Sequence, residues 1–323
     1  MKRRHTLALL ASGALACTLM ATTAQAAWPD KPITLVVPYA PGGTADALSR
    51  LIAQHLGPKL NTSVVVQNKA GASGMIGEAS VAQAAGDGYT VLYTATPFSI
   101  NPHLQKLPYD PQKDLVPVTL VGVTPMFVLV PKSSPYGNLE ALVKAGRQSP
   151  GKINFGSGGQ GTVQYMGAEL FNQATGAGMV HVSYKSGGPA LAAAIAGEID
   201  VGFGNLPAVS GHVKSGLLRA IAITSGKRHQ LYPDVPTIAE SAVKNYEVYE
   251  WNGMFVPKDT PAAVVTRLNT AVREVLATPE VKAKFESLGS EIVASTPEAF
   301  RQHLVKDSAK WAQTVKAAGI KKE

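Results

Sequence analysis

Three glycine-rich segments are the residues of this sequence whose types and spacing could bind a ligand. They read Pro-Gly-Gly-Thr-Ala-Asp at 41–46, Gly-Ser-Gly-Gly-Gln-Gly-Thr at 156–162 and Lys-Ser-Gly-Gly-Pro at 185–189. Each follows a short apolar run and precedes a stretch with helical periodicity, so each is expected at the start of a helix. A helix start presents unpaired N–H groups and the positive end of the helix dipole. Because glycine lets the backbone approach a ligand closely, these segments predict a pocket that holds a small anion through main-chain amides.

Other motif interpretations are weaker. The segment at 156–161 also fits G-x-G-x-x-G, but the next expected strand ends at Ser183-Tyr184-Lys185 without the acidic residue that holds a ribose hydroxyl. We therefore expect no nicotinamide cofactor, and no other cofactor is predicted. No G-x-S-x-G nucleophile elbow exists, because Phe155 lies two residues before Ser157. The histidines are scattered without a pair at i, i+4, so no metal site and no catalytic residues are expected; a triad assembled from distant segments is the open alternative.

Two charged residues near the glycine segments each have two candidate roles. Asp46 would either stabilise the first turn of a helix or contact an ammonium group on an amino-acid ligand. Lys185 would either contact a carboxylate or be an exposed lysine. Aromatic residues at strand ends would be cleft walls or core residues. They are Tyr39, Phe98, Tyr184 and Phe203.

The first 26 residues have the features of a secretory signal. Lys2-Arg3-Arg4 precede an apolar stretch at 6–21, and Ala24-Gln25-Ala26 forms a small-x-small site. We expect ordinary secretion with cleavage after Ala26, and lipidation at Cys17 is the minor alternative. Cys17 is the one cysteine of the chain. Its removal would leave no thiol for disulfides, thiolate catalysis or metal binding.

Charge and length narrow the protein class further. The formal net charge of the 323 residues is +8, and part of the excess lies on lysines near the C-terminus, where it predicts a solvated helix face. An exported protein without a basic-aromatic array is not expected to bind nucleic acid. The length suggests two domains of ordinary size.

Strand-like and helix-like segments alternate through most of the chain, which predicts mostly parallel, helix-covered sheets. Helices are expected at 260–277, 279–287 and 296–318, without enough strands nearby to form a sheet of their own. The predicted topology has domain I at 27–123 plus 225–323 and domain II at 124–224. Two crossovers without a flexible linker would form a hinge, with the glycine segments facing each other across a cleft.

In this order, the motifs resemble the tripartite tricarboxylate transporter receptor family, the TctC-like or Bug receptors. The resemblance runs from residue 28 to the C-terminal helices. It is carried by residues 37–43 with Asp46, 68–74, 87–90, 101–102, 108–110, 156–158, 184–187, 233–237 and 251–253. It implies an α/β type II periplasmic-binding-protein fold, with two mixed-sheet domains around a cleft and two crossovers. It also implies a periplasmic, non-enzymatic receptor, expected to be a monomer, that passes a small carboxylate to a membrane permease.

In such receptors main-chain groups, short polar side chains and waters hold the ligand. Carried onto this chain, the resemblance implies the following ligand-binding residues: Tyr39, Pro41, Gly42, Gly43, Asp46, Thr94, Thr96, Phe98, Ser157, Gly158, Gln160, Gly161, Thr162, Tyr184, Lys185, Gly187 and Asn205. Ser186 and the Thr-Pro-Phe at 96–98 depart from the commoner pattern near the ligand. The alternatives are a ligand-sensing receptor for a two-component kinase and an exported hydrolase. Tricarboxylates, dicarboxylates, amino acids, aromatic acids and nicotinate-type acids all remain candidate ligands.

Overall fold

The computed structural model describes residues 28–322 of the chain. The predicted signal sequence, its cleavage after Ala26 and the alternative role of Cys17 lie outside the described residues. Within residues 28–322, none of the helices combines the length and apolar character needed to cross a membrane.

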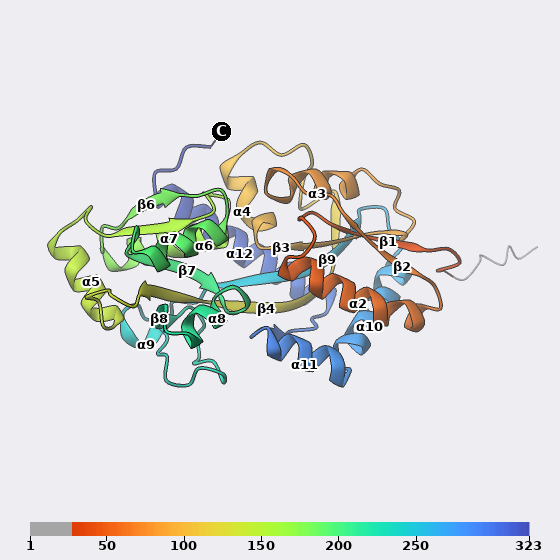
Figure 1. Cartoon of the computed structure of the whole chain (residues 1–323). Coiled ribbons are helices and arrows are strands. Elements are labelled where there is room, and N and C mark those ends of the chain that lie inside the picture. Colours follow the sequence, from red (N-terminus) through yellow and green to blue (C-terminus); the bar gives the residue numbers. More distant parts are fainter. Residues whose placement is uncertain (1–27, 323) are drawn as a thin grey trace, which may run out of the picture.

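Two α/β lobes lie side by side along the long axis of the molecule (Figure 1). The first lobe, at the right of Figure 1, uses both ends of the described chain. Its N-terminal elements are β1 (Ile33–Val37), α2 (Thr44–Leu60), β2 (Val64–Asn68), the short 3-10 helix η1 (Ala72–Gly74), α3 (Met75–Ala82), β3 (Thr90–Ala95) and α4 (Pro97–Leu104). Its C-terminal elements are β9 (Tyr249–Pro257), α10 (Ala262–Leu276), α11 (Pro279–Ser287) and β10 (Glu291–Ile292).

The second lobe comes from the middle of the chain. Its elements are α5 (Leu139–Gln148), β5 (Asn154–Ser157), α6 (Val163–Thr175), β6 (Val180–Ser183), α7 (Gly187–Ala196), β7 (Val201–Asn205), α8 (Leu206–Lys214), β8 (Leu218–Ile223) and α9 (Ile238–Ser241). Two further elements, β4 (Leu115–Pro131) and α12 (Pro297–Ala317), contact both lobes.

The strand β4 connects the sheets of the two lobes. Its residues 115–125 pair antiparallel with β9, and from Met126 onward it pairs antiparallel with β7 and β8. The sequence predicted two separate runs here, at 115–123 and 126–130. They form one strand because Thr124 and Pro125 stay paired, opposite Glu250 and Tyr249 of β9.

Both lobes contain mixed sheets, which confirms the predicted α/β fold class. β1 pairs parallel with β2 and β3, and β5 pairs parallel with β6 and β7. β9 instead runs antiparallel to β3 and β4 at the centre of the first sheet. The expectation of mostly parallel sheets is therefore wrong, because the central pairings are antiparallel.

Two elements near the cleft were not expected from the sequence. β9 carries Glu250, Asn252 and Gly253 among its apolar residues, and this composition does not resemble a buried central strand. The helix α4 has Pro97 at its first turn and Pro102 inside it. Proline at the first turn is compatible with a helix, but an interior proline removes a backbone donor and weakens the helical pattern.

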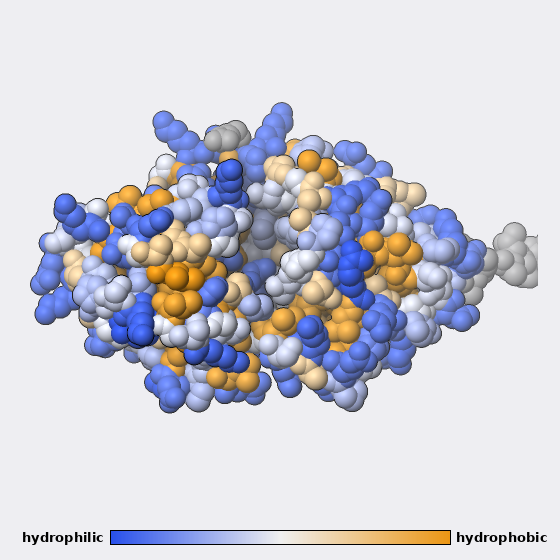
Figure 2. Space-filling model, in the orientation of Figure 1, coloured by the Kyte–Doolittle hydropathy of each residue, from blue (hydrophilic) through white to orange (hydrophobic). Residues whose placement is uncertain are grey.

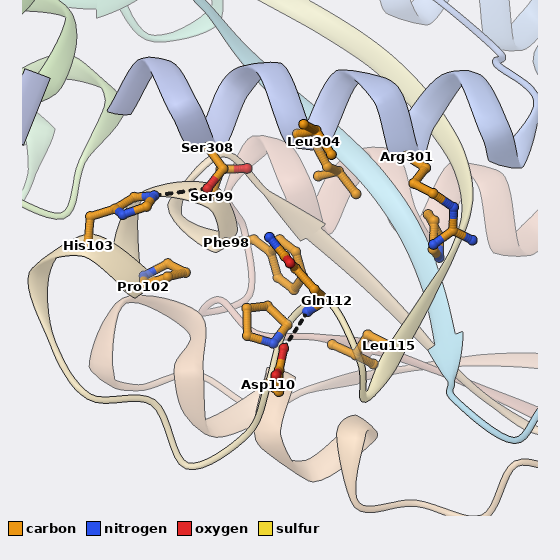
Figure 3. Close-up of a pocket in the computed structure, with 13 residues that line it drawn as sticks. Phe98, Ser99, Pro102, His103, Asp110, Gln112, Leu115, Arg301, Leu304 and Ser308 are labelled. Carbon is orange, nitrogen blue, oxygen red and sulfur yellow. Dashed lines mark hydrogen bonds between the residues drawn. The ribbon is translucent and has the colours of Figure 1, made fainter. Parts of the chain in front are cut away.

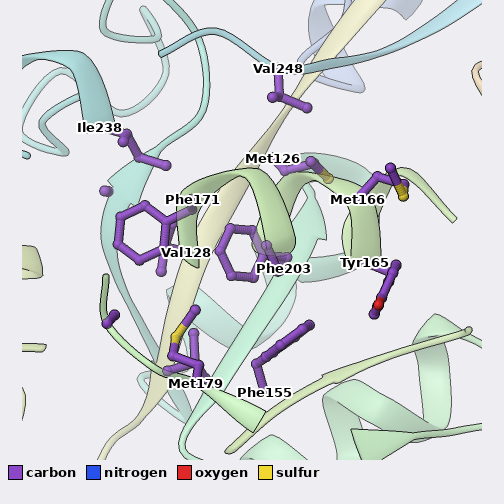
Figure 4. Close-up of a cluster of buried hydrophobic side chains, with 14 of the residues drawn as sticks. Met126, Val128, Phe155, Tyr165, Met166, Phe171, Met179, Phe203, Ile238 and Val248 are labelled. Atoms are coloured by element: carbon purple, nitrogen blue, oxygen red, sulfur yellow. The ribbon is translucent and has the colours of Figure 1, made fainter. Parts of the chain in front are cut away.

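The core of the second lobe surrounds β4, and Figure 4 shows Phe171 and Phe203 packed close to Met126 and Val128. Ile238 belongs to the same cluster. Tyr246 and Val248 also belong to it, and Tyr232 and Val235 pack on residues of α8 and β8, so these side chains of the segment at 225–248 contact the second lobe, whereas the sequence assigned 225–323 to domain I. The return to the first lobe follows Val248 with β9.

Three chain segments meet where the lobes join. Thr224 donates its N–H to the Met126 carbonyl at 2.8 Å, and its hydroxyl oxygen accepts from the Met126 amide at 2.8 Å. The same hydroxyl donates to the Val248 carbonyl at 2.7 Å. The crossovers between the lobes are therefore joined by hydrogen bonds, and a hinge at this place stays a prediction.

The helix α12 packs against both lobes, where the sequence predicted contact with the first alone. Phe300 lies in the first-lobe core, whereas Trp311 lies in the core around β4 and α6. Buried Asp307 accepts hydrogen bonds from the indole N–H groups of Trp251 on β9, at 2.8 Å, and of Trp311, at 3.0 Å. One acidic side chain thus ties α12 to the central strand of the first sheet.

Candidate functional site

A cavity of about 260 Å³ lies between the lobes, and Figure 2 shows the surface hollowed between them. Both lobes contribute to its wall, and the first lobe does so in part through β9. The lining residues are Tyr39, Gly43, Thr44, Ala45, Ala95, Pro97, Thr162, Val163, Gln164, Asn205 and Glu250. Four of the predicted residues are therefore brought together around one space: Tyr39, Gly43, Thr162 and Asn205.

Four helices begin at this cavity. Residues at the starts of α2, α4, α6 and α8 line its wall, so helix N-termini from both lobes point at one space. The caps of α2 and α8, Gly43 and Asn205, have no side-chain hydrogen bond to their helices. The starts of α2 and α8 therefore offer N–H groups without a side-chain partner, and all four helix starts direct positive dipole ends at the cavity, which favours an anionic ligand.

No lysine or arginine lines this cavity. Lys185, a candidate ligand contact, is exposed and is not among the lining residues. Within residues 28–322, no group of three or more His, Cys, Asp or Glu side chains is arranged to hold a metal ion. Main-chain groups are therefore the principal positive partners that the wall offers.

Asp46 holds the first glycine segment in place through hydrogen bonds. Its carboxylate accepts hydrogen bonds from the Gly42 amide at 3.0 Å, from Arg50 Nε at 3.1 Å and from Asn68 Nδ2 at 2.9 Å. Burial alone would raise the pKa of Asp46, but these hydrogen bonds lower it to about 2. Both carboxylate oxygens are occupied by protein donors, so Asp46 shapes the loop. Gly42, with φ of 91°, and Pro41 lie on its exposed side and do not line the cavity.

A hydrogen-bonded network lies behind Tyr39. The Tyr39 hydroxyl lies 3.3 Å from Thr94 Oγ1, which donates to the buried carboxyl of Glu78 at 2.7 Å. Tyr109 donates to the other oxygen of Glu78 at 2.7 Å. Thr94 is thus a residue behind the wall, and Tyr39 connects it to the cavity.

Thr96 and Phe98 also lie behind the cleft wall. Thr96 Oγ1 accepts a hydrogen bond from the Trp251 amide at 2.8 Å. Phe98 packs on Phe255 with ring centroids 4.6 Å apart. It borders a different cavity of about 350 Å³, between α4, the loop at 110–117 and α12, which Figure 3 shows with Leu304 and Arg301 on its α12 side. The structure therefore does not place Phe98 among the cleft residues.

The second glycine segment is held by an unexpected side-chain pair. Ser157, which is 1% exposed, lies 2.8 Å from His181 Nε2 and accepts a hydrogen bond from the Gly159 amide at 3.1 Å. Burial lowers the pKa of His181, which favours the neutral ring as acceptor of the Ser157 proton. The pair fixes the turn that leads to Thr162. Gln160 is exposed on this turn and does not line the cavity.

Gly158 and Gly161 are packing positions. A Cβ placed on Gly158 would lie 3.1 Å from Ser186 Cα, where the third glycine segment passes. A Cβ on Gly161 would lie 3.3 Å from Ser73 Oγ and from Asn101 Oδ1, both in the first lobe. The lobes therefore approach each other closely at Gly161, where side-chain atoms would have to shift for an added Cβ, whereas at Gly158 the neighbouring atoms are backbone.

The third segment borders a neighbouring cavity of about 310 Å³. Gly187 lines it, together with Phe203 and His212, and it shares Gln164 and Asn205 with the cleft cavity. Tyr184 packs beside Gly156 and lines neither cavity. Gly187 is thus next to the cleft cavity, separated from it by Gln164 and Asn205.

Glu250 is the principal cleft residue that the sequence analysis missed. It follows the hinge segment on β9, lines the cavity and accepts a hydrogen bond from Asn205 Nδ2 at 2.6 Å. Burial raises the pKa of Glu250, and the Asn205 hydrogen bond opposes that rise. Its position beside Trp251, within a motif that the sequence analysis had singled out, was the signal that could have revealed it.

The similarity to known proteins covers residues of both lobes. The chain matches the family described as "Tripartite tricarboxylate transporter family receptor" over residues 48–320. It is 34% identical over 315 residues to Protein BugT of Bordetella pertussis, an alignment that covers 97% of this chain and 95% of that protein. The structure of periplasmic binding protein BugD has a TM-score of 0.79 and 33% identity, with 92% of this chain and 100% of that chain covered. The R. palustris protein Rpa4515, solved with adipate, has a TM-score of 0.82 and 33% identity over the same shares of the two chains.

Proposed function

This chain belongs to the tripartite tricarboxylate transporter receptor family, and from that premise we propose that it is a periplasmic receptor that captures a small carboxylate and delivers it to a membrane transporter. The convergence of four helix N-termini on one interlobe cavity carries this proposal. The adipate of the Rpa4515 structure supports the carboxylate class. In this proposal the receptor acts in the periplasm, after cleavage behind Ala26, as a monomer.

Ligand capture follows from the division of the wall between two lobes. A carboxylate that touches helix starts of both lobes stabilises only the arrangement in which the lobes are close together. Each hydrogen bond from an amide to a charged oxygen contributes about 1.5–3 kcal/mol, so the neutral amide analogue of a ligand should bind more weakly. The closed receptor would then be the form that a permease subunit recognises.

Isothermal titration calorimetry on residues 27–323 tests this proposal. A thermal-shift screen of carboxylates, with and without amino groups, would select ligands, and each would then be compared with its neutral primary amide. We expect the amide to bind at least about tenfold more weakly. Equal affinity of acid and amide, or no binding by any carboxylate, would contradict the proposed recognition.

The transport role needs a separate measurement. Deletion of the gene should abolish uptake of the identified ligand by intact cells, and expression of the full chain should restore uptake. If uptake persisted while a ligand-dependent kinase response was lost, the sensor alternative would replace the delivery role.

The Ser157–His181 contact is a geometric observation that favours an exported hydrolase. It supports that alternative weakly, because Ser157 is buried and its hydroxyl also accepts from the Gly159 amide. A general base contributes only if its partner can reach the substrate. We therefore expect no ester hydrolysis; turnover that disappears with Ser157→Ala would overturn the receptor proposal.

A further inference from the structure

Resting on the proposed function, we propose that the ligand of this receptor carries an ammonium group as well as its carboxylate, and that Glu250 selects for that group. The ligand class is thus an amino carboxylate, bound as a zwitterion. The family match leaves this feature open, and the inference comes from the charges that face the cleft.

The position of Glu250 is the first argument. Its side chain reaches the cleft cavity from β9, the strand that follows the hinge segment. One oxygen, Oε2, accepts from Asn205 Nδ2 at 2.6 Å. The other oxygen, Oε1, has no hydrogen-bond donor among residues 28–322 and is not one of their buried unpaired atoms, so it is accessible to a donor on a ligand.

The lack of a compensating cation is the second argument. In the part of the chain that the structure describes, Glu250 forms no ion pair, and no basic side chain lines the cavity. The groups that face it are Asn205 and the hydroxyls of Tyr39 and Tyr93, whose pKa values are raised by burial and further by the Glu250 charge. Glu78 lies behind Tyr39 and supplies no positive charge. Apart from the positive helix starts, no cation of the described residues offsets an ionised Glu250, so a positive group on the ligand would be stabilised beside it.

Other residues of the same wall would bind the second charged group of a zwitterion. Helix starts at Gly43, Pro97 and Val163 favour the carboxylate of the ligand. Glu250 lines the same cavity of about 260 Å³, so both charged ends belong to one small ligand. A ligand with carboxylates alone would bring like charges together unless Glu250 took up a proton.

Asp46 was the acidic residue that the sequence offered for an ammonium group. In the structure its two oxygens are taken by Gly42, Arg50 and Asn68. Glu250 is the acid that lines the cleft cavity in residues 28–322. The role considered for Asp46 is therefore assigned to Glu250.

Matched ligand pairs test this assignment. Titration calorimetry on residues 27–323 would compare glutamate with glutarate, gamma-aminobutyrate with butyrate, and epsilon-aminocaproate with caproate. In at least one pair we expect the amino compound to bind about tenfold or more tightly than its partner. The Glu250→Gln variant should lose that preference while its affinity for the partner lacking the amino group stays equal or rises. Glu247→Gln, an exposed substitution on the same segment, should keep the preference.

The outcomes separate this inference from the function on which it rests. If plain carboxylates bind as tightly as the amino compounds, or Glu250→Gln keeps the preference, the Glu250 assignment is wrong and the carboxylate receptor stands. If the wild-type protein binds no compound of either kind, both proposals fail. Melting curves of each variant identify unfolding, and Glu250→Asp provides a second variant that keeps the charge but withdraws it from the ligand.

Discussion

Asp46 shows how a single side chain can shape a ligand site that it does not line. Its hydrogen bonds join the Gly42 amide to Arg50 and to Asn68 at the end of β2. These contacts hold the loop that brings Gly43 and the start of α2 to the cleft.

The Asp46→Asn variant should therefore bind ligand more weakly and be less stable. A neutral amide keeps the volume but loses the charged acceptor of Arg50 and Gly42, at a cost of about 1–3 kcal/mol. Because the pKa of Asp46 is lowered to about 2, its contribution is present at neutral pH and is lost as the pH falls from about 4 to about 2. Melting temperature and ligand titration measure both effects. Asp87→Asn, in the exposed pair with Lys31, is the control and should change little.

The buried acid Glu78 should make stability depend on pH in the opposite direction. Burial raises the pKa of Glu78 to about 7, although Thr94 and Tyr109 donate to its carboxyl. Since the folded state holds this proton more tightly, the stabilisation is complete below the unfolded pKa and is lost as the pH rises through about 7.

We expect the melting temperature of the wild type to fall between about pH 5 and about pH 8 more steeply than that of Glu78→Gln. Exposed Glu140→Gln should retain the wild-type slope. Parallel slopes for the wild type and Glu78→Gln would show that another group controls this range.

For single residues, the sequence predicted which loops border the cleft better than it predicted which side chains line the cavity. Tyr39, Gly43, Thr162 and Asn205 were identified because they belong to turns before helices. Glu250 was missed, because its strand was not recognised, and Phe98 was misplaced, because its direction depends on how α4 packs against Phe255. Such orientations are decided by tertiary packing, which local pattern does not contain.

The starts of four helices line the cleft cavity. Glycines near these starts have two roles: some leave space for a ligand, and others allow close packing of the backbone. Substitutions can separate these roles. A Cβ on Gly43 meets no atom within 4 Å, so Gly43→Val should fill cavity space and lower affinity at least about tenfold with a small change in melting. A Cβ on Gly158 would instead lie 3.2 Å from the Gly187 amide nitrogen. Gly158→Ala should therefore lower stability as well, by about 1–3 kcal/mol, because the neighbouring backbone must move. Equal melting temperatures for Gly158→Ala and the wild type would contradict this distinction.

The elements themselves were predicted well where hydrophobic periodicity is regular, as in α2, α6 and α10. β4 was split in two because its partner changes near Met126, and the sequence gives no sign that pairing continues through Pro125. The central antiparallel pair of β4 and β9 joins segments more than a hundred residues apart. Pairing over that separation cannot be read from local pattern.

At the scale of the whole molecule, the two lobes lie close enough for an engineered disulfide to hold them together. A Cβ on Gly161 would lie 3.7 Å from Ser73 Cβ, within the range of about 3.5–4.5 Å that disulfides require. The double variant Ser73→Cys with Gly161→Cys, expressed as residues 27–323, has no other cysteine. Under oxidising conditions we expect ligand association to slow at least about tenfold, with recovery on reduction.

Stopped-flow binding measures this effect, and each single cysteine variant is the control. Unchanged association in the fully oxidised protein would mean that ligand enters without separation of the lobes.

The Asp307 contacts give this protein an internal optical probe. Two of its three tryptophans, Trp251 and Trp311, donate to the same carboxylate oxygen, and α12 carries that carboxylate against helices of both lobes. Any rotation of one lobe against the other must change the surroundings of at least one indole. Intrinsic emission should therefore report domain motion without an added dye, and a substitution at Asp307, which does not line the cleft cavity, should change that emission by removing the acceptor of both indoles.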